Sequence, residues 1–134
     1  MIYKQRIMDQ VLEYRLSSKG AVLITGPKWC GKTTTAKRHA ISFLNMQDPI
    51  SKQQYLALAK INPLEMLKGG TPRLIDEWQI SPNIWDAVRQ EVDRRGEFGQ
   101  FILTGSSVPA KMDASSHSGI GRIVAVKMRP MSLF

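Results

Sequence analysis

The sequence contains little that would cross-link the chain or anchor it in a membrane. It has one cysteine among 134 residues, so no disulfide can form within the chain. No apolar run approaches the roughly 20 residues that a membrane-spanning helix needs. The first ten residues alternate apolar with charged side chains, unlike a secretory signal. These absences exclude the disulfide-rich and membrane-spanning classes, and they predict a cytoplasmic protein.

Acidic residues are also scarce. The chain has 11 Asp and Glu against 19 Lys and Arg, a formal net charge of +8, and residues 1–40 hold eight bases and two acids. Such a charge attracts an anionic small ligand or nucleic acid, although a solvated surface explains it as well. No helix-turn-helix or zinc motif and no aromatic interleaving accompanies the basic segment, so nucleic-acid binding has no motif to support it.

The length and the 43% hydrophobic content are those of one globular domain, which we expect to span residues 1–134. Helical patterns alternate with short apolar runs, which predicts an α/β fold with a mostly parallel sheet covered on both faces. One helix is expected over 48–60, with Asp48 as its cap and Pro49 in its first turn, and Asn62 to Glu65 has capping-box spacing for a short helix. The expected strands are 21–25, 41–46, 73–76, 101–104 and 122–128.

The segment between the first expected strand and the next helix matches the phosphate-binding pattern G-x-x-x-x-G-K-[ST]. It reads GPKWCGKT over residues 26–33. The glycines let backbone N–H groups turn inward, and the helix that follows adds the positive end of its dipole, so a cradle for the α- and β-phosphates is predicted. Lys32 is expected to reach the β- and γ-phosphates, and the Thr33 hydroxyl to hold Mg²⁺. The residues expected to contact the nucleotide are Gly26, Pro27, Lys28, Trp29, Cys30, Gly31, Lys32, Thr33 and Thr34.

A second informative segment is the expected strand 73–76, which has an apolar centre at Leu74 and Ile75 and ends in the adjacent acids Asp76 and Glu77. Ligands of open α/β sheets collect at the carboxyl ends of strands, so Asp76 is expected to bind Mg²⁺ directly or through water. Glu77 would orient and polarise a water molecule for in-line attack on phosphorus. In isolation the two acids would predict only a solvated turn, and the upstream phosphate-binding loop makes the catalytic interpretation the better one.

Two further polar positions are candidates for the same site. The run 101–104 ends in Thr104, which stands where a group that senses the γ-phosphate or positions water would lie, and Ser106 is the reserve candidate. Arg122 would supply positive charge to the transferring phosphoryl group, within the chain or across a subunit boundary of a homo-oligomer. A plain turn and a surface arginine explain these residues as well, so both assignments stay open.

In order and spacing, GPKWCGKTTTA, LIDEWQ, FILTGSS and GRIVAVKMRPMSLF resemble the AAA-type ATPase domain at the N-terminus of a large group of bacterial and archaeal proteins. The resemblance implies a three-layer α/β/α core whose five-stranded sheet has the order 5-1-4-3-2. It also implies ATP and Mg²⁺ as ligands, with Lys32, Thr33, Asp76 and Glu77 in the roles given above. Family members usually continue past Phe134 into a second domain, so this chain is expected to lack a C-terminal domain.

The predicted function is a Mg²⁺-dependent ATPase module that converts ATP to ADP, weak or inactive as this fragment. One alternative is a small-molecule kinase. Such kinases have an arginine-rich lid, and here only Arg94 and Arg95 could be part of one. Another is a nucleic-acid-binding module regulated by ATP, suggested by the basic run at 37–39. A GTPase is disfavoured because there is no N-K-x-D motif and no glycine three residues after Asp76.

Overall fold

The computed structural model describes residues 2–27, 31–106 and 123–128, with residues 2–6 described by their backbone alone. These segments alternate between strand and helix. The elements in chain order are α1 (Ile2–Leu16), β1 (Ala21–Thr25), α2 (Lys32–His39), β2 (Ser42–Asn45), α3 (Lys52–Ile61), the 3-10 helix η1 (Pro63–Leu67), β3 (Arg73–Asp76), the 3-10 helix η2 (Trp78–Ile80), α4 (Asn83–Arg95), β4 (Phe101–Gly105) and β5 (Ile123–Lys127).

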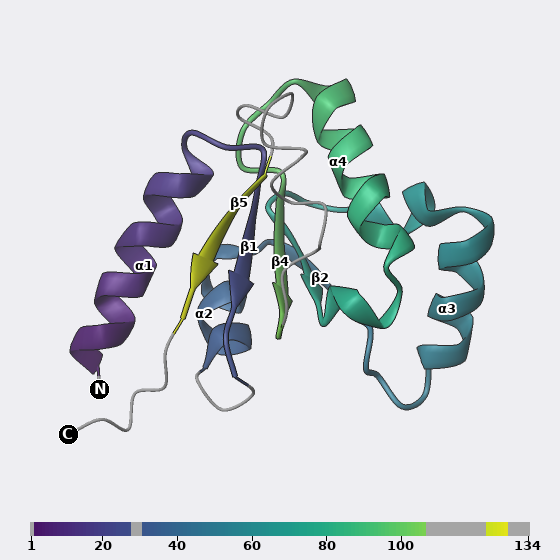
Figure 1. The fold of residues 1–134 in the computed structure, drawn as a ribbon, viewed down its shortest axis with the longest axis horizontal. Helices are drawn as coiled ribbons and strands as arrows, with labels where there is room; N and C mark the ends of the chain where they lie inside the picture. The colour runs from purple at the N-terminus through teal and green to yellow at the C-terminus, as the bar shows by residue number, and fades with distance from the viewer. Residues whose placement is uncertain (1, 28–30, 107–122, 129–134) are drawn as a thin grey trace.

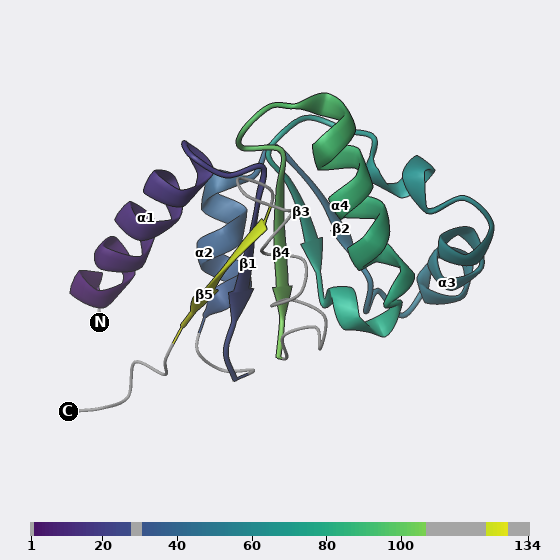
Figure 2. The same cartoon turned by 45° about the horizontal axis from the view of Figure 1, so that its top comes forward.

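The strands form one parallel sheet in the order β2-β3-β4-β1-β5. From the other edge this order is 5-1-4-3-2, so the expected sheet and its three-layer α/β/α arrangement are confirmed. In Figures 1 and 2, α2 lies behind the central strands, and α4 lies on the opposite side of the sheet. Within the described segments, no helix is both long and apolar enough to cross a membrane.

Alternating side chains of the central strands supply the core on both faces of the sheet. In β1, Ala21 and Leu23 face one side, Val22 and Ile24 face the other, and all four are fully buried. The first side packs against α3, η1 and α4, and the second packs against α1 and α2. Burial on both faces explains why this strand is a continuous apolar run. The carboxyl end of the strand then leads directly into the polar loop of the site.

The helix expected over 48–60 begins later than predicted. α3 starts at Lys52, and the Asp48 side chain instead accepts a hydrogen bond from the Ile50 N–H at 3.4 Å. Asp48 therefore closes a turn in front of the helix, which is a common alternative use of this side chain. The capping-box prediction is also wrong, because the Asn62 side chain makes no capping hydrogen bond to η1.

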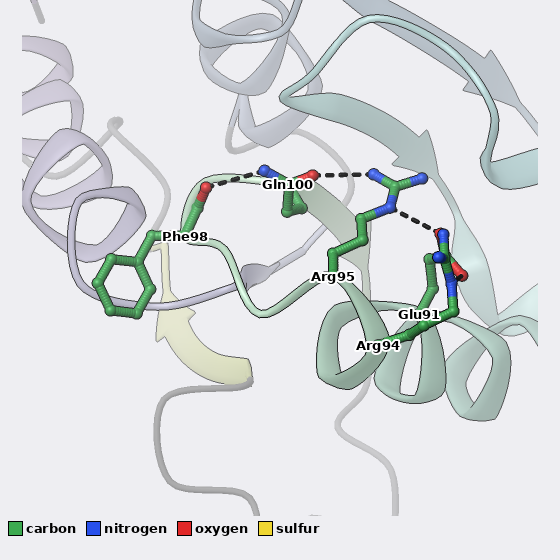
Figure 3. Close-up of polar contacts among 5 residues, drawn as sticks. All are labelled: Glu91, Arg94, Arg95, Phe98 and Gln100. Atoms are coloured by element: carbon green, nitrogen blue, oxygen red, sulfur yellow. Dashed lines mark hydrogen bonds and ion pairs between the residues drawn. The ribbon is translucent and has the colours of Figure 1, made fainter.

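The end of α4 is connected to the start of β4 by a chain of hydrogen bonds (Figure 3). The Glu91 carboxylate accepts from Arg94 Nη2 at 2.5 Å and from Arg95 Nε at 2.7 Å. Arg95 Nη1 also donates to Gln100 Oε1 at 2.9 Å, and Gln100 Nε2 donates to the Phe98 carbonyl at 3.0 Å. These contacts hold the loop that connects α4 to β4, the strand that pairs with β1.

Replacing Glu91 by glutamine is expected to lower the free energy of unfolding by about 1–2 kcal/mol near neutral pH. Hydrogen bonding from Arg94, helped by Arg95, lowers the pKa of Glu91 from 4.5 to about 2. A carboxyl whose pKa is lower in the folded state stabilises the fold fully above its ordinary pKa. This stabilisation is lost as the pH falls from 4.5 through about 2.

Urea unfolding of the wild type and Glu91→Gln, near neutral pH and at about pH 2.5, measures this effect. The stability difference between the two proteins should shrink at the lower pH. Glu97→Gln is the matched control, because Glu97 is an exposed glutamate just beyond α4. An equal loss in both variants, or a difference that does not change with pH, would contradict the prediction.

Candidate functional site

The carboxyl ends of β1, β3 and β4 meet at one edge of the sheet. The strand register places Asp76 of β3 beside Thr104 of β4, and Thr25 of β1 beside Gly105 of β4. All three strands run in parallel, so the segments that follow them leave the sheet at this same edge. The phosphate-binding pattern, the acidic pair and the polar end of β4 are therefore brought together.

The described part of the phosphate-binding loop has a backbone that favours glycine. Gly31 has a φ of 85°, a left-handed conformation that glycine adopts without strain. It stands immediately before Lys32, the first residue of α2. The N-terminus of α2, with N–H groups that have no intrahelical acceptor, therefore opens at the site. Lys28, Trp29 and Cys30 lie outside the described residues.

Asp76 accepts hydrogen bonds from two hydroxyl groups at this edge. Thr33 Oγ1 donates to Asp76 Oδ1 at 2.8 Å, and Thr104 Oγ1 donates to the same oxygen. Thr104 Oγ1 in turn accepts from the Glu77 N–H at 3.2 Å. Thr104 is fully buried and Asp76 is 8% exposed. A hydroxyl from α2 and a hydroxyl from β4 thus fix the carboxylate at the end of β3.

Glu77 faces Lys32 across the same edge. Its Oε2 lies 3.9 Å from Lys32 Nζ, which also donates to the Pro27 carbonyl at 3.3 Å. Lys32 is 2% exposed and Glu77 is 7% exposed, so water screens their attraction only weakly. Glu77 has a φ of 61°, a left-handed conformation that costs a non-glycine residue about 1–3 kcal/mol and is concentrated at functional sites.

The side chains at this edge suit a magnesium ion and a polyphosphate. The Asp76 carboxylate and the Thr33 hydroxyl are hard oxygen ligands, and Mg²⁺ in nucleotide sites is held by one or two such groups together with phosphate oxygens. Among the described residues, no group of three or more His, Cys, Asp or Glu side chains could hold a metal ion. The buried ammonium group of Lys32 is a positive charge of the kind that phosphate oxygens require.

The other predicted site residues are less involved or cannot be placed. Thr34 is exposed on α2, and Ser106 is exposed just after β4. Arg122 lies outside the described residues. Gln79 is the last residue of the LIDEWQ segment, but no role was predicted for it; it donates from Nε2 to Glu77 Oε1 at 2.6 Å. Sequence periodicity carries no signal for this contact, because it depends on the left-handed turn at Glu77.

A family model that describes an AAA domain matches residues 18–134, which is most of the chain. The chain belongs to the AAA domain family. This family assignment agrees with the phosphate-binding loop and with the acidic end of β3. It identifies the chain as an ATP-binding P-loop module.

Two uncharacterised mycobacterial proteins, one from Mycobacterium bovis and one from Mycobacterium tuberculosis, are each 27% identical to this AAA domain over 138 residues. The alignments cover 99% of this chain, and the chain spans 30% of the length of each relative. A solved structure of a DNA replication initiation factor matches with a TM-score of 0.49 and 18% identity, covering 92% of this chain and 44% of that one.

Replacing Thr104 by valine is expected to destabilise the AAA domain by about 1–3 kcal/mol, because valine keeps the shape and removes the hydroxyl. Asp76 would lose one donor, and the buried Glu77 N–H would lose its acceptor. Thr104→Ser retains the hydroxyl and is the matched control. Urea unfolding of both variants measures the difference. A valine variant as stable as the serine variant would show that the hydroxyl contributes nothing.

Proposed function

We propose that this AAA domain hydrolyses ATP in a Mg²⁺-dependent reaction. The observation that carries the proposal is the 2.8 Å hydrogen bond between Thr33 and Asp76, beside the 3.9 Å approach of Lys32 to Glu77. These contacts join the segment that matches the phosphate-binding pattern to the acidic end of β3, which supports a site where triphosphate binding and proton transfer occur together. The phosphate-binding loop alone would support only nucleotide binding, and the acidic pair alone would support only acid–base chemistry.

Binding is assigned to Lys32 and to the N-terminus of α2. The Pro27 carbonyl holds Lys32 Nζ close to the loop, so little side-chain freedom remains to be lost when phosphate arrives. The β- and γ-phosphates then compete with Glu77 for this ammonium group, since both are anionic. Thr33 and Asp76 are the residues that would hold Mg²⁺.

Glu77 is assigned the role of orienting and deprotonating the attacking water molecule. Its carboxylate accepts a proton from the water as the water oxygen bonds to the γ-phosphorus. The bond from the γ-phosphorus to the β,γ-bridging oxygen breaks, and ADP leaves with the bonding electrons. Bound Mg²⁺ supplies charge neutralisation on the phosphate oxygens. Thr104 supports both acids, by donating to Asp76 and by accepting from the Glu77 N–H, so we assign it a positioning role.

Two measurements on the same preparation test the proposal. Calorimetric titration of ATP with and without Mg²⁺ measures binding, and the release of inorganic phosphate from Mg-ATP measures turnover. We expect binding that Mg²⁺ strengthens, together with phosphate release that needs no added acceptor. Phosphate transfer that requires an added acceptor would favour the small-molecule kinase, and a protein that does not bind ATP would overturn the proposal.

A further inference from the structure

Gln79 contacts Glu77 in a way that the proposed reaction leaves unexplained. Gln79 Nε2 donates to Glu77 Oε1 at 2.6 Å, whereas Oε2 is the oxygen that lies 3.9 Å from Lys32 Nζ. Each oxygen of the carboxylate therefore has its own positively polarised partner. A carboxylate held at both oxygens keeps one orientation, while an unsupported glutamate samples several rotamers.

The end of β4 provides the space for the Gln79 amide. A β carbon on Gly105 would lie 2.4 Å from Gln79 Oε1 and 2.7 Å from Trp78 Nε1, closer than a β carbon can approach without displacing them. Gly105 is not among the glycines with a positive φ. The glycine is therefore required by the close approach of these two side chains and not by its own backbone angle.

The oxygen of the Gln79 amide shows which contact determines the orientation of the amide. Within the described residues, Gln79 Oε1 and Trp78 Nε1 are buried and have no hydrogen-bond partner. Buried polar atoms are normally paired, so an amide placed only for stability would be expected to satisfy both of its ends. Among the described residues, the amide is paired through its nitrogen with Glu77, and its oxygen has no partner. Its orientation is thus set by the carboxylate that it contacts.

We propose that Gln79 is a positioning residue that aims the Glu77 carboxylate, and that Gly105 lacks a side chain so that the Gln79 amide can reach it. This inference rests on the proposed function, in which Glu77 orients the attacking water. When nucleotide takes Lys32 away from Glu77 Oε2, the Gln79 amide still holds Oε1. The freed oxygen is then presented to water while the carboxylate stays in place.

Gln79→Met tests the proposal, because methionine keeps the length of the side chain and removes the donor. We expect kcat to fall about 10- to 100-fold, as for a reacting group that is slightly misplaced, with the Kd for Mg-ATP within about twofold of wild type. Gln54→Met is the matched control, because Gln54 is exposed on α3 and should keep wild-type turnover. A Gln79→Met variant with wild-type kcat would overturn the inference while leaving the proposed function intact.

Gly105→Ala tests the second half of the proposal without altering Glu77 or Gln79. The added β carbon should displace the Gln79 amide and lower kcat to a similar extent, again with little change in Kd. Because both changes remove one interaction, the double variant should be no slower than the slower single variant. Losses in kcat that multiply in the double variant would show two independent effects and would overturn this coupling.

A structural measurement decides the question even if the chain does not turn ATP over. The nucleotide-free crystal structure of Gln79→Met, or of Gln79→Leu if the first variant does not fold, is expected to show the Glu77 carboxylate moved from its wild-type position, because Oε1 has lost its donor. A carboxylate that stays in its wild-type position without the amide donor would overturn the inference. An inactive wild type with a displaced carboxylate would instead count against the proposed hydrolysis alone.

Discussion

Lys32→Ala is expected to abolish detectable binding of ATP, which is the largest effect on affinity that we predict. Lys32 Nζ is the buried cation beside the loop, and a contact between a charged group and a phosphate contributes about 1.5–3 kcal/mol, roughly 10- to 100-fold in Kd. The substitution also leaves the Glu77 carboxylate without the ammonium group that lies 3.9 Å away. An unpaired carboxylate next to the phosphates adds repulsion to the lost attraction.

Calorimetric titration of Mg-ATP into wild type and Lys32→Ala measures this effect. Lys37→Ala is the matched control, because Lys37 is an exposed lysine five residues further along α2. It lies over the ring of Phe43, with Nζ 4.6 Å from the ring centroid. We expect this control to bind ATP as wild type does. Equal affinity in wild type and Lys32→Ala would refute the assignment of the phosphate site.

Glu77→Gln is expected to retain ATP binding and to lose turnover by about 10²- to 10⁴-fold, the usual contribution of a general base. Glutamine keeps the shape of the side chain and can still accept a hydrogen bond, but it cannot take up a proton from water. Removing a negative charge that lies close to Lys32 should, if anything, favour the phosphates. The expected signature is thus a fall in kcat with an unchanged or lower Kd.

Phosphate release measures kcat, and calorimetric titration of the same preparation measures the Kd for Mg-ATP. Glu65→Gln is the matched control, since Glu65 is an exposed glutamate in η1 whose salt bridge to Lys68 lies on the surface. If Glu77→Gln hydrolysed ATP at the wild-type rate, the role of Glu77 would be wrong even though the binding site would stand. If it lost binding as well, Glu77 would have to contribute to the fold of the site.

Local patterns in the sequence were enough to predict most of the elements. The run 21–25 is a strand because apolar residues fill both of its faces, and Gly96 ends α4 with a φ of 65°, as a glycine after a helix commonly does. Such features depend on neighbours a few residues away. The predictions for Asp48 and Asn62 were wrong because their short polar side chains suit turns as well as helix caps.

The residues of the candidate site could be predicted from the sequence, since the phosphate-binding pattern and the acidic pair are contiguous motifs. The strand order came from a family resemblance and not from the residues, because each apolar run fits several places in a sheet. Sheet order and register, however, decide which side chains meet. Thr33 and Asp76 are 43 residues apart and lie in contact only because β3 and β1 flank β4.

The support of Glu77 is seen only in the folded chain. Gln79 reaches Glu77 because of a left-handed turn, and it fits because β4 ends in Gly105 beside it. Neither condition is a repeating pattern: the first is a local backbone turn, and the second joins residues that are distant in the sequence. A motif specifies the reactive groups through covalent neighbours, whereas their orientation depends on packing between elements that are distant in the sequence.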